Sequence, residues 1–164
     1  MNGGRGKSLE AQTESALAAV TAAWFRNEPK MQGKIRVAGG TPDYTALVGG
    51  VAHLIECKSG SKTSLPLGYL TTPESGSVGA GITPAQAAML DRWEAAGGRG
   101  WIVASLPGPV ILGVAAPPHV ALIPWQEWRR WLAAGLRSVR PEVLAGRGEL
   151  VLQMRAAWTQ NSVV

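Results

Sequence analysis

The chain has 164 residues, 46% of them hydrophobic, which is enough for one folded domain with a core and excludes an intrinsically disordered chain. The single cysteine, Cys57, excludes a disulfide framework within the chain and favours a reducing cytoplasm. The net charge of +5 favours a polyanionic partner, although a basic protein without one has the same composition. We expect no membrane-spanning segment, no signal peptide and no zinc site, because no apolar run or histidine spacing fits them.

The N-terminal part predicts a basic leader followed by a helix. Residues 1–8 are rich in glycine and basic side chains, and we expect them to be mobile. Ser8 can cap a helix that runs to about Phe25. Glu10 falls in its first turn, where the helix dipole favours a carboxylate without any further function.

The next elements are predicted strands. Residues 27–32 form a turn, and alternating polarity over 34–38 predicts a short strand. Tyr44–Val48 and Val51–Ile55 are apolar runs on either side of Gly49-Gly50, which indicates a two-residue β-hairpin.

Charged residues stand at the open end of this predicted hairpin. Side chains alternate along a strand, so Glu56 and Lys58 share one face and Cys57 points to the other. The hairpin brings Asp43 near Glu56, and two close carboxylates repel unless a cation lies between them. Hard oxygen ligands suit Mg²⁺ or Mn²⁺, and a metal-bound water beside a lysine can cleave a phosphodiester. The alternative is an edge hairpin with a surface Glu–Lys pair.

A loop and a well-marked helix follow. Residues 59–81 are rich in Ser, Gly, Thr and Pro and predict a flexible loop, either ordered on DNA with Lys62 near a phosphate or without a role. Thr83 begins a helix with a proline at its first position and Gln86 in a capping box, and Gly97-Gly98 ends it.

The C-terminal half predicts more strands and a helix with two faces. Strands are expected over 101–106, 110–114, 120–123 and 149–154, and a helix from Trp125 to about Val139. One face of this helix is aromatic and apolar, which favours core or dimer surface over base stacking. The other face carries arginines that are either solvated or bind phosphates.

Two stretches resemble known nucleases. Pro42-Asp43 with Glu56-Cys57-Lys58, in the context GTPDY…ECKSG, resembles the PD-(D/E)xK nuclease signature. The leader NGGRGKSLE resembles the start of RecU-type and archaeal Holliday-junction resolvases. RecU-type enzymes carry a long stalk before the motif, where this chain has a short link. The resemblance covers about Asn2 to Leu106, and it implies an α/β restriction-endonuclease-like PD-(D/E)xK fold with a mixed central β-sheet flanked by helices.

The resemblance also implies a set of site residues. The implied catalytic residues are Asp43, Glu56, Lys58 and Glu10. One or two Mg²⁺ ions, or Mn²⁺, are expected per active site, with ligands drawn from Thr41, Asp43, Glu56, the backbone carbonyl of Cys57, Gln86 and Glu10. Basic residues expected to contact DNA are Arg5, Lys7, Arg36 and Lys62.

The implied function is that of a Holliday-junction resolvase. Such an enzyme is a metal-dependent, structure-selective endonuclease that makes paired symmetric nicks in four-way DNA junctions. Two identical active sites related by a two-fold axis suit that task, so we expect a single nuclease domain over 1–164 that forms a homodimer. The expected setting is the cytoplasm of a bacterial, archaeal or phage-infected cell, with no organic cofactor. The alternatives are another nuclease of the same fold, for repair, restriction or flap cutting, and a junction-binding protein that does not cleave.

Overall fold

A mixed five-stranded sheet forms the centre of the molecule. The computed structural model describes residues 3–28, 31–32, 35–36, 40–60, 63–68 and 81–159. The strands lie in the order β1-β4-β5-β7-β10. Their bounds are Trp24–Arg26 (β1), Tyr44–Val48 (β4), Val51–Ser59 (β5), Arg99–Leu106 (β7) and His119–Pro124 (β10). Strands β5 and β7 run parallel and the other neighbours antiparallel.

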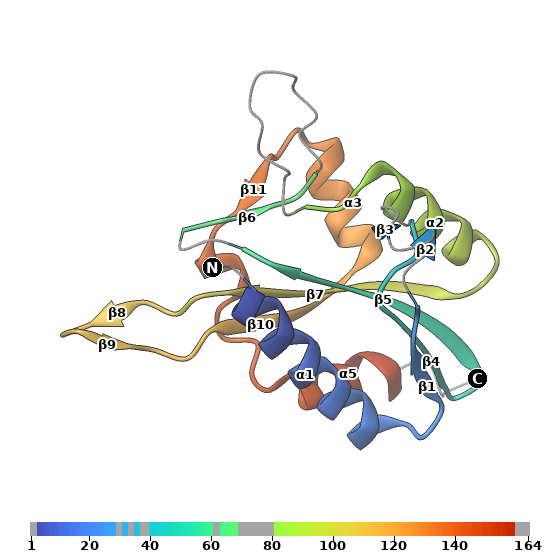
Figure 1. The fold of residues 1–164 in the computed structure, drawn as a ribbon, viewed down its shortest axis with the longest axis horizontal. Helices are drawn as coiled ribbons and strands as arrows, with labels where there is room; N and C mark the ends of the chain where they lie inside the picture. Colours follow the sequence, from blue (N-terminus) through green and yellow to red (C-terminus); the bar gives the residue numbers. More distant parts are fainter. Residues whose placement is uncertain are drawn as a thin grey trace.

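Helices cover both faces of this sheet (Figure 1). Helices α1 (Gly3–Val20) and α5 (Leu150–Thr159) pack on one face, and α2 (Pro84–Ala95) and α3 (Trp125–Ala133) on the other. Alternate strand residues feed the two cores: Leu54 and Ile102 lie in the α2/α3 core, whereas Ile55 and Val103 lie in the α1/α5 core. The predicted α/β class, with a mixed central sheet flanked by helices, is confirmed. No helix in the described ranges is long and apolar enough to cross a membrane.

The hairpin at the centre of the sequence forms as predicted. Strands β4 and β5 pair antiparallel, from Tyr44 opposite Ile55 to Val48 opposite Val51. Gly49 and Gly50 have φ angles of 57° and 79°, and glycine adopts these left-handed values without steric cost. The side chains along β5 therefore alternate between the two faces of the sheet, as the sequence predicts.

Smaller elements surround the sheet. Residues Met31–Gln32 (β2) and Ile35–Arg36 (β3) pair with each other. Strands β8 (Val110–Ile111) and β9 (Val114–Ala115) form a second short hairpin. Strands β6 (Leu65–Pro66) and β11 (Ser138–Val139) also pair, and α4 spans Pro141–Leu144.

The first helix differs from the prediction at both ends. It begins at Gly3, so Ser8 is not its N-cap and residues 3–8 are part of the helix. It ends at Val20, because the Thr21 hydroxyl accepts a hydrogen bond from the Ala23 N–H and turns the chain into β1. Met1 and Asn2 lie outside the described residues.

Part of the predicted 59–81 loop is ordered structure. Ser59 is the last residue of β5, and Leu65–Pro66 forms β6. Leu65 and Leu67 are fully buried, and the Trp128 indole N–H donates to the Leu67 carbonyl. The prediction missed this because two leucines in a polar stretch gain their burial only from distant parts of the chain that form the α2/α3 core. Residues 61–62 and 69–80 lie outside the described residues.

The C-terminal predictions need three corrections. The predicted helix over 125–139 ends at Ala133, since Gly135 takes a left-handed φ of 79° and the chain then enters β11. The predicted strand over 110–114 is the β8–β9 hairpin. The predicted strand over 149–154 is helix α5, which buries Leu150, Met154 and Trp158 at a spacing of four residues.

Candidate active site

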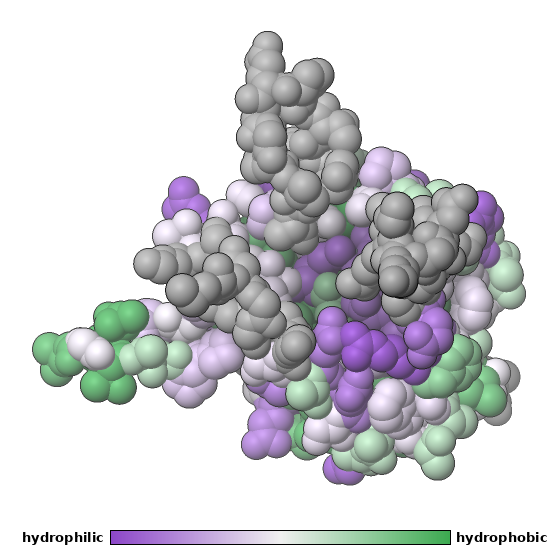
Figure 2. All heavy atoms as spheres, in the orientation of Figure 1, coloured by the Kyte–Doolittle hydropathy of each residue, from purple (hydrophilic) through white to green (hydrophobic). Residues whose placement is uncertain are grey.

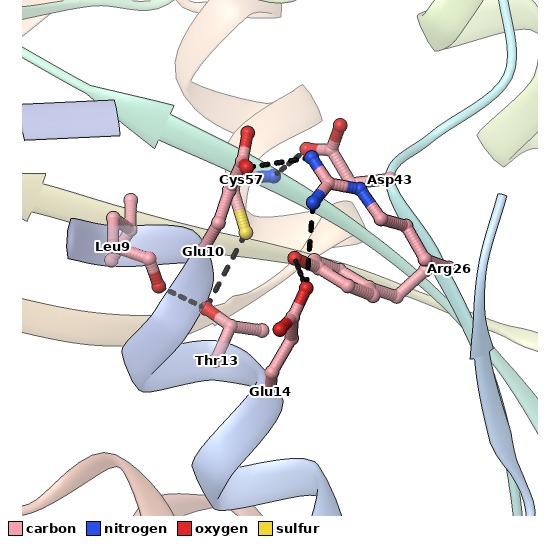
Figure 3. Close-up of polar contacts among 8 residues, drawn as sticks. Leu9, Glu10, Thr13, Glu14, Arg26, Asp43 and Cys57 are labelled. Atoms are coloured by element: carbon pink, nitrogen blue, oxygen red, sulfur yellow. Dashed lines mark hydrogen bonds and ion pairs between the residues drawn. The ribbon is translucent and has the colours of Figure 1, made fainter. Parts of the chain in front are cut away.

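The site lies where β4 ends and β5 continues. The last β4–β5 pair is Tyr44 opposite Ile55, and β5 then runs on to Ser59 beside β7 alone. Asp43, just before β4, occupies the vacated position and accepts a hydrogen bond of 2.8 Å from the Cys57 N–H (Figure 3). The hairpin therefore brings Asp43 to the end of β5, as the sequence predicts.

Cys57 presents its backbone to Asp43 and its side chain to α1. The N–H and C=O of one strand residue point to the same side, so the Cys57 carbonyl faces the side of β4 where no strand partner remains. Its Sγ lies 3.4 Å from the Thr13 hydroxyl on α1 (Figure 3). The thiol is thus on the face opposite Glu56 and Lys58, as predicted.

Glu56, Lys58 and Gln86 form a compact polar cluster on the other face. Lys58 Nζ lies 2.7 Å from Glu56 Oε1, and the Gln86 amide donates to the same oxygen at 2.6 Å. The Gln86 oxygen accepts from Lys58 Nζ at 3.2 Å and from the Thr83 N–H at 3.0 Å. The capping box is complete, so Gln86 caps α2 and also contacts both charged residues of the motif.

Glu56 is a buried carboxylate with one unused oxygen. Its side chain is 3% exposed, and Oε2 has no hydrogen-bond partner among the described residues. Burial, and next the charge of Asp43, raise the pKa of Glu56 to about 7, against the lowering effects of Lys58 and Gln86. Burial also raises the pKa of Asp43, while the Cys57 N–H and Lys58 oppose that shift.

These groups fit a hard divalent cation. An orphaned buried carboxylate oxygen, a second carboxylate and a free-facing backbone carbonyl are the oxygen donors that Mg²⁺ and Mn²⁺ take. A cation would also relieve the repulsion between Asp43 and Glu56. Within the described residues no three His, Cys, Asp or Glu side chains form a metal-binding group, so water or backbone oxygens would have to complete the coordination.

Glu10 approaches this site from α1. Its carboxylate forms an ion pair of 2.6 Å with Arg26 on β1 (Figure 3), and its charge raises the pKa of Asp43. Thr41 is half-buried two residues before Asp43, but the described hydrogen bonds do not connect it with either carboxylate. The neighbouring Gly40 packs against Ala85 so closely that a Cβ would come within 2.8 Å.

The side chains expected to contact DNA are not among those that the structure describes. Lys62 is outside the described residues, and the side chains of Arg5, Lys7 and Arg36 are likewise not described. Their predicted phosphate contacts stay predictions.

Sequence reasoning missed two residues that hold the motif. Asn27 donates from its side-chain amide to the Pro42 carbonyl at 2.7 Å, and its backbone N–H donates to the Asp43 carbonyl at 2.8 Å. Arg26 pairs with Glu10 and lies 5.9 Å from the Tyr44 ring centroid. The predicted end of α1, at Phe25, lies immediately before these two residues and five residues after its actual end at Val20. No local sequence pattern marks either residue as part of the site.

Fold and site together describe an α/β protein with a buried Glu–Lys–Gln cluster at the open end of a central hairpin. No known protein-family model matches the sequence, and no curated protein is significantly similar to it. What the site does therefore has to be argued from its geometry.

Proposed function

We propose that this protein is a metal-dependent endonuclease of the PD-(D/E)xK type that cleaves branched DNA. The observation that carries the proposal is Oε2 of buried Glu56, which has no hydrogen-bond partner among the described residues and lies next to the charge of Asp43, within a cluster that also holds Lys58. Burying two carboxylates and an ammonium is costly unless the arrangement has a use. A cation between the carboxylates and a phosphate near the lysine would compensate these charges.

Each residue has a definable task. Asp43, Glu56 and the Cys57 carbonyl would hold Mg²⁺ or Mn²⁺, one or two ions per site, with Glu10 close enough to assist. The bound ion supplies a water of lowered pKa and charge stabilisation at the scissile phosphate. Lys58, held by Glu56 and Gln86, would hydrogen-bond the attacking water or the phosphate oxygens. Gln86 would keep the lysine and glutamate in fixed rotamers.

We further propose that the substrate is a four-way junction and that the enzyme acts as a homodimer. The net charge of +5 suits a polyanion, and a junction is resolved by two symmetric nicks, which two copies of one site can make. The likeness of the leader and motif to Holliday-junction resolvases supports this choice among nucleases. Other nucleases of the same type and a non-cleaving junction binder are the competing functions.

Cleavage of a labelled synthetic junction tests this function. The junction and a linear duplex built from the same arms are incubated with the protein in Mg²⁺, in Mn²⁺ and in EDTA, with the Asp43→Asn variant as the inactive control. Paired nicks in the junction alone, lost in EDTA and in the variant, are the expected result. Equal cutting of both substrates would indicate a less selective nuclease. Junction binding without cutting in either metal would refute the nuclease function.

A further inference from the structure

An apolar arm projects from the end of the central sheet. Residues 107–118, PGPVILGVAAPP, connect β7 to β10 and contain the β8–β9 hairpin, which extends away from the body of the molecule (Figure 1). Four large side chains on it are more than 60% exposed: Val110 68%, Ile111 63%, Leu112 99% and Val114 70%. Figure 2 shows this arm as a hydrophobic projection. Exposed apolar surface gathered in one place indicates an interaction site.

The arm is poorly stabilised by its own contacts. Val110 pairs with Ala115 and Ile111 with Val114, so both faces of the two-stranded ribbon carry apolar side chains. An isolated two-stranded ribbon is marginal in water without a covering layer. At its tip Leu112 has a φ of 50°, a left-handed conformation that disfavours a branched side chain. A strained and fully exposed leucine is unfavourable in a single chain, and burial of its side chain by a partner would compensate for this cost.

The charge of the arm identifies the class of partner. Residues 107–118 contain no Lys, Arg, Asp or Glu. A segment that enters DNA or lies on an anionic membrane normally carries lysine or arginine for the phosphates. A neutral, β-branched arm instead has the composition of the apolar centre of a protein–protein interface.

A matching pocket lies at the base of the same arm. It has a volume of about 500 Å³ and is lined by α1, the end of β5 and the arm base, including Leu9, Gln12, Gly60, Pro109 and Ala116. Apolar arm and pocket on one molecule make a self-complementary surface. We propose that two copies of this chain exchange arms about a two-fold axis, each arm tip occupying the pocket of the partner.

The pocket is lined by two residues that are sequence neighbours of candidate active-site residues. Ser59, which follows Lys58, and Leu9, which precedes Glu10, both line it. An arm in this pocket would hold α1 against the end of β5 and pair the two active sites. The inference rests on the proposed homodimer and not on the proposed cleavage, because self-association is measured without DNA.

The molar mass in solution tests the exchange. Light scattering should give the wild type twice the 17.2 kDa of one chain, and Leu112→Asp and Ile111→Asp should give single chains. The dimer dissociation constant should rise at least about 100-fold in both variants. The matched control is Leu152→Asp, because Leu152 is 55% exposed on α5, away from the arm, and this variant should stay dimeric. Near-ultraviolet circular dichroism checks that each variant is folded.

A cysteine cross-link locates the contact. Leu112→Cys mixed with Gln12→Cys should form a disulfide-linked heterodimer under mild oxidation, whereas Leu152→Cys with Gln12→Cys should not. A monomeric wild type, or arm variants as dimeric as the wild type, would overturn the inference. Arm variants that stay dimeric but lose junction binding would assign the arm to DNA and overturn it equally. A dimer without nuclease activity would leave the arm exchange standing and refute the proposed function instead.

Discussion

The side-chain amide of Gln86 donates a hydrogen bond of 2.6 Å to Glu56 Oε1, across 30 residues of sequence. Through its oxygen, the same side chain accepts from Lys58 Nζ and from the Thr83 N–H. The cap of α2 and the charged pair at the end of β5 are therefore one hydrogen-bonded unit, and any shift of the helix start moves the site.

Gln86→Ala should impair cleavage far more than stability. The variant loses the contacts to Glu56 and Lys58 and half of the capping box, so we expect a loss of about 1 kcal/mol in unfolding free energy and a 10–100-fold lower single-turnover rate. Thr83→Ala is the matched control, because it removes the cap hydroxyl and leaves the Glu56 contact in place. Equal losses of rate in the two variants would show that Gln86 acts only as a cap.

Asp43→Asn should abolish cleavage without unfolding the protein. The asparagine oxygen can still accept the Cys57 N–H, whereas the negative charge for a cation is lost. Burial raises the pKa of Asp43, so its ionised form destabilises the fold as the pH rises above the unfolded-state pKa. The metal-free variant should therefore resist denaturant slightly better than the wild type at pH 8. Loss of junction binding by a folded variant would contradict this role.

Lys58→Met should stop cleavage without abolishing metal binding. The methionine keeps the length of the side chain and removes the ammonium that contacts Glu56 and Gln86. Because Lys58 lowers the pKa of Glu56, its loss should raise that pKa further above about 7 and move metal binding to higher pH. Titration calorimetry with Mg²⁺ at two pH values measures both effects. A variant that still cleaves would remove Lys58 from the mechanism.

Glu10→Gln should lower cleavage about tenfold or more, through loss of charge near the site. Glu10 and Glu14 both contact Arg26, at 2.6 Å and 3.5 Å, but only the charge of Glu10 affects Asp43. Glu14→Gln therefore serves as the control and should cleave like the wild type. Both variants should lose less than about 1 kcal/mol of stability, because the ion pairs with Arg26 are solvent-exposed and a glutamine oxygen can still accept the hydrogen bond that Glu14 takes from the Tyr44 hydroxyl. Equal rates in both variants would place Glu10 outside the active site.

His53 should make the fold sensitive to acid. It is 1% exposed, and its Nδ1 accepts from the Trp101 indole N–H at 2.9 Å. Burial, with a smaller effect of Arg99, lowers its pKa from 6.5 to about 4. As the pH falls, His53 is therefore protonated in the unfolded chain before it is protonated in the folded protein. Its contribution to the free energy of unfolding is complete above pH 6.5. About 3 kcal/mol of this stability is lost as the pH falls toward 4.

Denaturant unfolding at pH 7 and pH 4.5 measures the effect of His53. The wild type should lose more stability between the two pH values than His53→Gln, which has no titrating group at position 53. Glu56 titrates in the opposite direction in both proteins, so its effect cancels in the comparison. The same loss in both proteins would show that His53 is not the acid-sensitive group.

The hairpin and the helix cap could be predicted because their determinants are neighbours in the chain. Gly49-Gly50 allow the left-handed turn, and the alternation along β5 places Glu56 and Lys58 on one face. Thr83 and Gln86 are three residues apart and satisfy each other's backbone N–H groups. Short-range sterics and hydrogen bonds decide such features, and these are visible in the sequence.

Helix α5 shows why other parts of the fold could not be predicted from the sequence. Over residues 149–154, its apolar residues fit a strand as well as a helix. Burial of Leu150, Met154 and Trp158 against α1 and the sheet favours the helix, and that surface exists only once the chain has folded.

The sequence by itself determined the acid–lysine motif of this protein and the hairpin that carries it. Only the tertiary structure decided that Arg26 pairs with Glu10 and that Gln86 joins Glu56. It also decided that one Glu56 oxygen is buried with no hydrogen-bond partner in the described part of the chain. It also left the 107–118 arm exposed. The physical reason is that desolvation and long-range hydrogen bonds depend on which distant segments meet, and no local spacing encodes that.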